Sequence, residues 1–204
     1  MMMWSQSNFE KAEKLFKDEK YSQAEVLFEG ILKTNPADTK VIEYLGDIAG
    51  QSKSWDKAIV FYKKLKLLKP SEADYHYKYG GALGMKAKTV NKFKALGMID
   101  EVKGSFEKAI VLNPKHIDAR WALIELYIQL PGIVGGSEYK ALKYSNELAK
   151  LSPVDGYLSR GHIDEYFKRY AAAELQYKKA LQAGSTKVAT QKLDNLYKLK
   201  AKKS

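Results

Sequence analysis

A pattern of residues recurs every 34 positions through the first half of the chain. Ala24 returns as Ala58, and Asn35-Pro36 returns as Lys69-Pro70. Self-similarity at a period of this size indicates supersecondary units that stack on their neighbours, rather than one closed core. The chain is therefore expected to be a repeat protein, and stacked helix pairs of this kind form grooves that usually hold another chain.

The pattern continues into the second half with two insertions. Pro114 and Pro153 end two further units, but the steps between successive prolines exceed the period by about ten and about five residues. The extra residues fall at 85–96 and 131–137. A fifth unit has Ser185 where the proline is expected. We therefore expect a single domain, 1–204, with repeats at about 5–38, 39–72, 73–116, 117–153 and 154–185, and a capping helix at 186–200.

The spacing of apolar residues predicts that every unit is helical. Ala24, Phe28 and Ile31 lie on one helical stripe, and no segment alternates convincingly with period two. We therefore expect an all-α fold without a sheet. Gly46 stands inside a predicted helix, where glycine costs about 1 kcal/mol relative to alanine. We expect a close approach of the paired helix there, under Ala58.

These residues resemble the tetratricopeptide repeat (TPR) family over nearly the whole chain. The family pattern has a small residue in the first helix, an aromatic residue that opens the second helix, then an alanine and a second aromatic residue. The matching positions are Ala12, Gly46, Gly80 and Gly161; Tyr21, Trp55 and Tyr170; Ala24, Ala58, Ala141 and Ala173; and Phe28, Tyr62, Phe106 and Tyr177. Ser145 departs from it at an aromatic position, and Val102 at an alanine position. Residues 131–137 are also similar to Pro-Gly-x-x-Gly-Gly-Ser loops of bacterial TPR proteins. The resemblance implies an α-solenoid of about five repeats in which the first helices line a concave groove.

The expected groove positions are acidic although the chain carries a formal net charge of +11. Nine acidic residues fall at the positions that the resemblance assigns to the groove: Glu10, Glu13, Glu43, Asp47, Asp74, Asp118, Glu125, Asp155 and Glu165. Only Lys17, Lys40 and Lys78 are basic at equivalent positions. A groove that follows a nucleic-acid backbone would have the opposite charge. We therefore expect nucleic acid to be an unfavoured ligand of this surface.

Aromatic residues share the same expected groove. Side chains such as Tyr44, Tyr77 and Trp121 could anchor an extended or helical peptide while carboxylates attract its lysines or arginines. The other interpretation is that several of these rings belong to the core between repeats. We expect a scaffold or adaptor that binds a protein or peptide, with a basic one favoured, through Tyr44, Asp47, Tyr77, Trp121 and Glu125.

The lysines support an alternative function. They concentrate in the second helices, at the C-terminal tail and in the insertion at 85–96, which contains Lys86, Lys88, Lys92 and Lys94. A basic convex surface could bind nucleic acid or an anionic envelope. The simpler interpretation is a solvated face, with the first helix of the third repeat running longer. Both interpretations remain open at this point.

No group of residues indicates catalysis, a cofactor or a metal. His76, His116 and His162 each lack a second histidine at metal-ligand spacing, and the chain has no cysteine. Residues 131–137 are glycine-rich but lack the ending of a phosphate-binding loop, so a turn with Ser137 as helix cap is expected. We therefore expect a protein that is not an enzyme.

The sequence contains no apolar run near 18 residues, and Met1–Trp4 does not resemble a secretion signal. A cytoplasmic location is expected from the visible chain, and a periplasmic one if a leader was removed.

Overall fold

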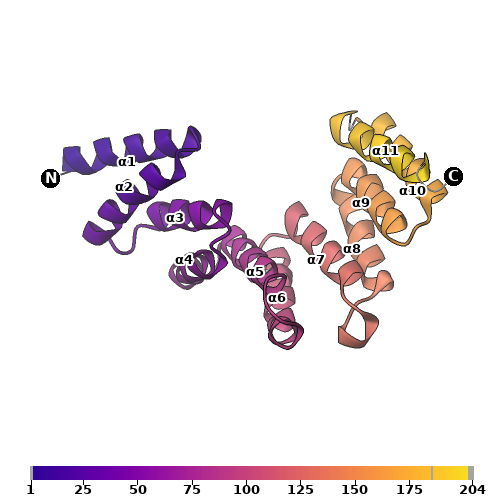
Figure 1. Cartoon of the computed structure of the whole chain (residues 1–204), viewed down its shortest axis with the longest axis horizontal. Coiled ribbons are helices and arrows are strands. Elements are labelled where there is room, and N and C mark those ends of the chain that lie inside the picture. The colour runs from indigo at the N-terminus through magenta and orange to yellow at the C-terminus, as the bar shows by residue number, and fades with distance from the viewer. Residues whose placement is uncertain (1, 185, 202–204) are drawn as a thin grey trace. The chain divides into compact units, whose positions relative to one another are not determined.

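The computed structural model describes residues 2–184 and 186–201, and within these ranges every regular element is a helix (Figure 1). The helices are α1 (Met2–Lys17), α2 (Tyr21–Thr34), α3 (Thr39–Gln51), α4 (Trp55–Leu68), α5 (Ala73–Ala87), α6 (Lys92–Leu112), α7 (Ile117–Gln129), the short 3-10 helix η1 (Gly132–Val134), α8 (Glu138–Leu151), α9 (Pro153–Tyr166), α10 (Tyr170–Gln182) and α11 (Thr186–Ala201). The all-α fold predicted from the apolar spacing is confirmed.

The helices divide into two compact units. The N-terminal unit, Met1–Leu112, contains α1–α6, and the C-terminal unit, Asn113–Ser204, contains α7–α11. Within each unit, a helix packs mainly against the helices before and after it in the chain. Packing between sequence neighbours is the arrangement of a repeat protein. The division into five repeats within one domain stays a prediction, and the expected boundary at Ser185 lies outside the described residues.

Three turns inside helix pairs share one backbone geometry. Each has three residues, and the middle residue, Glu19, Lys53 or Lys168, has a φ of 58°, 56° or 61°. The N–H of the next residue then donates to a carbonyl five residues earlier, at 2.8 Å in all three turns. A left-handed conformation costs a non-glycine residue about 1–2 kcal/mol. The packing of the two flanking helices must therefore hold these turns in place.

One of the four repeat prolines, Pro153, begins a helix instead of ending a unit as the repeat pattern indicated. Pro36, Pro70 and Pro114 lie in turns that follow α2, α4 and α6, as expected. Pro153 instead is the first residue of α9, and the Ser152 side chain before it accepts a hydrogen bond from the backbone N–H of Asp155 at 3.2 Å. Proline suits this position because the first N–H of a helix has no partner within the helix.

The insertion at 85–96 mainly lengthens the second helix of the third pair. α5 has 15 residues, whereas α6 has 21, compared with 14 in both α2 and α4. The Asn91 side chain accepts a hydrogen bond from the backbone N–H of Lys94 at 3.0 Å and so caps the start of α6. The interpretation that the first helix takes up the insertion was therefore largely wrong.

A tyrosine ring of the second helix packs directly on a glycine of the first. A Cβ atom built on Gly46 would lie 2.6 Å from Cε1 of Tyr62, and one built on Gly161 would lie 2.5 Å from Cε1 of Tyr177. Both distances are too short for any side chain, so glycine is required unless the ring moves. The predicted close approach is confirmed at Gly46, but the contacting residue is Tyr62, one turn beyond Ala58.

The fourth pair reverses the sizes of these two residues. Gly46 and Tyr62 are each the eighth residue of their helix, and the eighth residues of α7 and α8 are Ile124 and Ser145. Ile124 is fully buried, and Ser145 is almost fully buried. The Ser145 hydroxyl lies 2.8 Å from the hydroxyl of Ser159 on α9, so its polar atom has a partner. The departure of Ser145 from the repeat pattern is thus matched by a large residue on the facing helix.

Candidate functional site

In the N-terminal unit, polar side chains of successive first helices bond to one another. The Tyr44 hydroxyl on α3 donates to Glu13 Oε1 on α1 at 2.7 Å. Lys78 Nζ on α5 donates to Glu43 Oε1 at 2.6 Å and to the two carboxylate oxygens of Asp47 at 2.8 and 2.9 Å. The partners stand 31 or 35 residues apart, about one repeat. We call these five residues the polar ladder.

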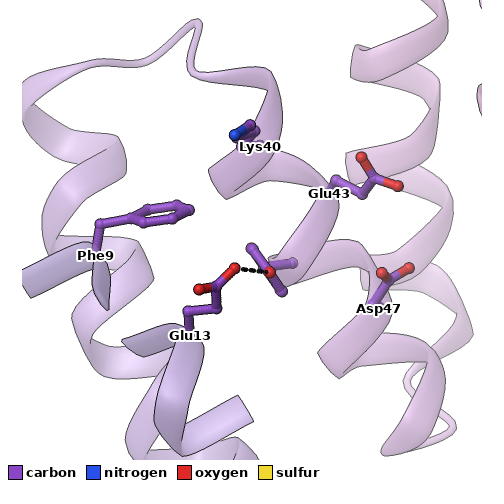
Figure 2. A pocket seen from close by; sticks show the side chains of 6 residues that line it. Phe9, Glu13, Lys40, Glu43 and Asp47 are labelled. Carbon is purple, nitrogen blue, oxygen red and sulfur yellow. Dashed lines mark hydrogen bonds between the residues drawn. The ribbon is translucent and has the colours of Figure 1, made fainter. Parts of the chain in front are cut away.

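A hollow of about 290 Å³ lies beside the polar ladder. Figure 2 shows Phe9 and Glu13 reaching from α1 toward α3, which supplies the other lining residues. Those residues are Lys40, Glu43, Tyr44 and Asp47. The hollow therefore combines an aromatic ring, carboxylates and one lysine between two successive first helices.

The polar ladder contains one lysine and three carboxylates, so it keeps a net negative charge. Burial lowers the pKa of Lys78, but its hydrogen bonds to Asp47 and Glu43 and their negative charges outweigh burial and raise it overall. The hydrogen bond from Tyr44, followed by that from Lys17, lowers the pKa of Glu13. All three carboxylates of the hollow therefore already accept hydrogen bonds within the chain.

Two further tyrosines supply donors to the carboxylates of α3. The Tyr62 hydroxyl donates to Asp47 Oδ1 at 2.7 Å, and the Tyr75 hydroxyl donates to Glu43 Oε2 at 3.2 Å. Burial, and then the negative charge of Glu43, raise the pKa of Tyr75 to about 12. These phenols remain neutral donors at physiological pH, and Lys78 is the cation that both carboxylates share.

Tyr44 belongs to the core as much as to the hollow. Its ring stacks on Phe28, with ring centroids 4.7 Å apart and an angle of 8° between the planes. It also meets the rings of Phe9 and Phe16 edge-on, at centroid distances of 6.0 and 4.9 Å. Burial, followed by the bond to Glu13, raises the Tyr44 pKa to about 12. The interpretation of some groove aromatics as core residues fits this ring.

The C-terminal unit contains equivalent bonds between its first helices. Trp121 Nε1 on α7 donates to Asp155 Oδ1 on α9 at 2.9 Å. Glu125 Oε2 lies 2.7 Å from His162 Nε2, and Glu125 also contacts Gln129. The two pairs between helices are separated by 34 and 37 residues, again about one repeat. Half-buried Trp121 also packs against the apolar cluster around Leu158.

The five predicted site residues have different surroundings. Tyr44 and Asp47 line the hollow, whereas the Tyr77 ring lies against Phe106, at a centroid distance of 5.9 Å. Trp121 and Glu125 belong to the C-terminal unit, where α9 supplies their partners. Sequence reasoning missed the bonds of Lys78 and His162 to the carboxylates. The available signal was a complementary donor and acceptor about one repeat apart.

Residues 131–137 form a closed turn between α7 and α8. The backbone N–H of Gly136 donates to Pro131 O at 3.1 Å, and that of Ser137 donates to Tyr127 O at 2.9 Å. The Ser137 side chain accepts a hydrogen bond from the backbone N–H of Lys140 at 3.2 Å, as expected of a helix cap. The likeness of this loop to those of bacterial proteins stays a prediction.

The described residues form neither a metal-binding group nor a membrane-spanning helix. No three histidine, cysteine or acidic side chains there are grouped so that they could hold a metal ion. None of the described helices has the length and apolar character needed to span a membrane.

Solved structures with a similar arrangement include TPR proteins. TTC0263, a TPR protein of Thermus thermophilus, has a TM-score of 0.74 and 17% identity over 95% of this chain and 98% of that one. YrrB, described as a TPR protein with an unusual peptide-binding site, has a TM-score of 0.60 and 15% identity over 97% and 91%. An IFIT1 mutant solved with Gppp-AAAA has a TM-score of 0.79 and 22% identity, over 94% of this chain but only 45% of that one. No protein-family model and no curated protein matches the sequence. At these identities the likenesses show the fold alone, and that fold is a TPR-like α-solenoid of helix pairs with a C-terminal helix.

Proposed function

We propose that the protein is a non-catalytic scaffold or adaptor that binds a segment of another protein along the first helices of its repeats. The TPR-like fold supports a protein-interaction role in general, and YrrB is described as having a peptide-binding site. The observation that carries the proposal is the hollow between α1 and α3, which is large enough to receive a side chain. Fold alone does not define function, so the proposal depends on this site.

A basic side chain fits the hollow best. Glu43 and Asp47 share the half-buried cation of Lys78, whereas Glu13 is paired with Lys17, whose side chain is 67% exposed. An exposed pair of this kind is worth little and is easily exchanged. A partner lysine or arginine could therefore replace Lys17 at Glu13 while it contacts the Phe9 ring, combining a charge-assisted hydrogen bond with a cation–π contact.

The other predicted residues extend this proposal. Asp47 would position Lys78 beside the hollow, and Tyr77 on α5, outside the hollow, would contact the partner segment farther along the first helices. In the C-terminal unit, Trp121 and Glu125 offer the same combination of a ring and a carboxylate, and the Glu125 side chain is 43% exposed. We propose that a second segment of the partner contacts this pair.

A peptide selection tests the proposal. Peptides would be selected from a random phage-displayed library, and the affinity of a selected peptide would be measured by fluorescence anisotropy. Glu13→Gln keeps an acceptor for Tyr44 but removes the charge, so affinity should fall about tenfold. Lys40→Glu adds a negative charge to the hollow and should raise the affinity severalfold. The matched control Lys63→Glu makes the same change on an exposed position of α4 and should leave affinity nearly unchanged.

The selection also shows how the proposal would fail. Selected peptides without an enriched lysine or arginine would remove the basis for a basic partner. Equal effects of Lys40→Glu and Lys63→Glu would mean that net charge, rather than the hollow, controls binding.

A further inference from the structure

The hairpin that joins α5 and α6 carries a concentrated positive charge. No acidic residue occurs between Asp74 and Asp100, and this stretch contains five lysines. Lys78 belongs to the polar ladder. The other four surround the turn between the helices: Lys86, Lys88, Lys92 and Lys94. In Figure 1 this turn lies at the lower tip of the hairpin.

Most of this charge is not neutralised within the chain. Lys86 pairs with Asp56 at 2.6 Å. In the part of the chain that the structure describes, Lys88, Lys92 and Lys94 are exposed and form no ion pair. The positive charge of the tip is therefore directed to solvent and available to an anionic surface.

Apolar side chains are exposed among these lysines. Phe93 is 88% exposed in the first turn of α6, and Leu96, one turn later, is 44% exposed. Met85, near the end of α5, is 41% exposed. Phe93 lies between Lys92 and Lys94 in the sequence, so an exposed aromatic ring is flanked by two cations. Phe106, farther along α6, is by contrast buried.

A shallow hollow of about 460 Å³ adjoins the tip on the side of α4. Its charged and hydroxyl-bearing lining residues are Lys53, Ser54, Asp56, Lys57, Lys86 and Thr89. Three lysines and one carboxylate line this hollow, although Lys57 pairs with Glu25, Lys86 pairs with Asp56, and the Thr89 hydroxyl donates to Lys86 O at 2.8 Å. The basic surface thus continues from the tip onto the turn between α3 and α4.

We propose that the α5–α6 tip binds the surface of an anionic lipid bilayer, with Phe93 and Leu96 entering the interface and Lys88, Lys92 and Lys94 contacting lipid phosphates. Apolar side chains with lysines beside them are the combination that binds the headgroup region. A purely polar polyanion would match the lysines but would leave Phe93, Leu96 and Met85 in water. This surface lies outside the polar ladder, so the inference goes beyond the proposed peptide binding.

The expected binding is reversible and selective for anionic lipid. Each basic residue near such a surface contributes about fivefold to the partition coefficient, so three lysines give about a hundredfold preference over a neutral bilayer. The electrostatic part should weaken strongly with salt, because exposed charges are screened within about 8–10 Å at physiological ionic strength.

Vesicle flotation tests the inference with the full chain. The vesicles would be pure phosphatidylcholine, or phosphatidylcholine with phosphatidylglycerol as about one lipid in three. Wild type should float with the anionic vesicles only. Phe93→Ala should reduce binding about tenfold, and Lys92→Gln/Lys94→Gln about twentyfold. The matched controls are Ile133→Ala, which removes another highly exposed apolar side chain, and Lys63→Gln/Lys108→Gln, which removes two exposed lysines of the same unit. Both controls should bind as wild type.

A dye placed on α6 reports the depth of the contact. The chain has no cysteine, and a Cβ on Gly97 or Gly104 would meet no atom within 4 Å, so Gly97→Cys and Gly104→Cys can each be labelled singly. Gly97 lies one turn from Phe93 on the same helical face, and Gly104 lies about 10 Å farther along the axis. An environment-sensitive dye at position 97 should shift to the blue on anionic vesicles, whereas the dye at position 104 should not.

Several results would overturn the inference. They are equal flotation with neutral and anionic vesicles, no flotation with either, or unchanged binding by Phe93→Ala. Tighter binding to a single-stranded oligonucleotide that Phe93→Ala leaves intact would assign the tip to nucleic acid instead. Equal dye shifts at positions 97 and 104 would exclude docking through the tip.

Discussion

Replacing glycine by alanine should have opposite effects at two positions of the N-terminal unit. Gly104 lies in the middle of α6 with no atom within 4 Å of an added Cβ, so Gly104→Ala should stabilise the protein by about 1 kcal/mol through helix propensity alone. Gly46→Ala has the same propensity gain, but its Cβ would lie 2.6, 3.0 and 3.1 Å from three ring atoms of Tyr62. Normal carbon contacts are about 3.5–4.0 Å, so the ring would have to move by about 1 Å.

The Tyr62 ring has little freedom to make this movement. Only 7% of the residue is exposed, and its hydroxyl donates to Asp47 at 2.7 Å. Overpacking of a buried site costs about 1–3 kcal/mol. After the propensity gain is subtracted, Gly46→Ala should destabilise by up to about 2 kcal/mol. The two variants should therefore differ by about 1–3 kcal/mol.

Urea unfolding followed by far-ultraviolet circular dichroism measures both free energies of unfolding. The double variant Gly46→Ala/Tyr62→Leu provides the decisive control, because leucine lacks the ring atoms that meet the new Cβ. The overpacking cost of Gly46→Ala should disappear in the Tyr62→Leu background, giving a favourable coupling energy of about 1–3 kcal/mol. If Gly46→Ala stabilised as much as Gly104→Ala, close packing on Tyr62 would not explain the glycine.

Three further predictions concern the charged and phenolic groups. Lys78→Met leaves the carboxylates of Glu43 and Asp47 without their shared cation. Because all three side chains are partly exposed, the free energy of unfolding in urea should fall by only about 1–2 kcal/mol. An unchanged midpoint would contradict the role of Lys78. The Tyr44 pKa is about 12 in the folded protein and near 10 when unfolded, so its contribution to stability is present below pH 10 and is lost as the pH rises from 10 to 12. Tyr44→Phe should flatten that part of the pH–stability curve, and a curve as steep as that of wild type would assign the loss to other groups. Hydrogen bonds from α10 and α11 hold the Glu174 pKa at about 2, against an ordinary 4.5, so the contribution of Glu174 to stability is present above pH 4.5 and is lost as the pH falls toward 2. Glu174→Gln should remove this loss in acid titrations followed by circular dichroism. An unchanged acid transition would show that α11 docks by other contacts.

The helical fold could be predicted because it depends on residues that recur at a fixed period. Ala24 and Ala58 mark the same buried place in successive repeats, and both are fully buried. The Gly46 contact was foreseen in kind, since a glycine inside a helix needs a reason. The partner was misjudged because a ring reaches back over the preceding turn, so Tyr62 rather than Ala58 covers the glycine.

The candidate site was harder to predict than the fold. Assigning positions to the first helices does not show which side chains bond to each other, and these pairs are formed by polar residues outside the apolar period. The acidic surface was expected from nine carboxylates, but the sequence did not show that the single cation of Lys78 bonds to two of them. Helix ends were also hard to predict. An insertion can extend either neighbouring helix, as the early start of α6 shows, and a proline can begin the next helix rather than follow the last one, as Pro153 does.

The reversed pair of α7 and α8 affects how the chain can assemble. Helix pairs built to one pattern have similar packing surfaces. Misassembly between such similar units is a characteristic failure of repeat proteins. An aromatic residue such as Tyr62 would clash with Ile124, and Ser145 placed against Gly46 would leave an unfilled space. The large residue on α7 and the small residue on α8 thus fit each other better than either fits a helix of another pair. This irregular pair therefore disfavours pairing of α7 or α8 with a helix of another pair while the chain folds.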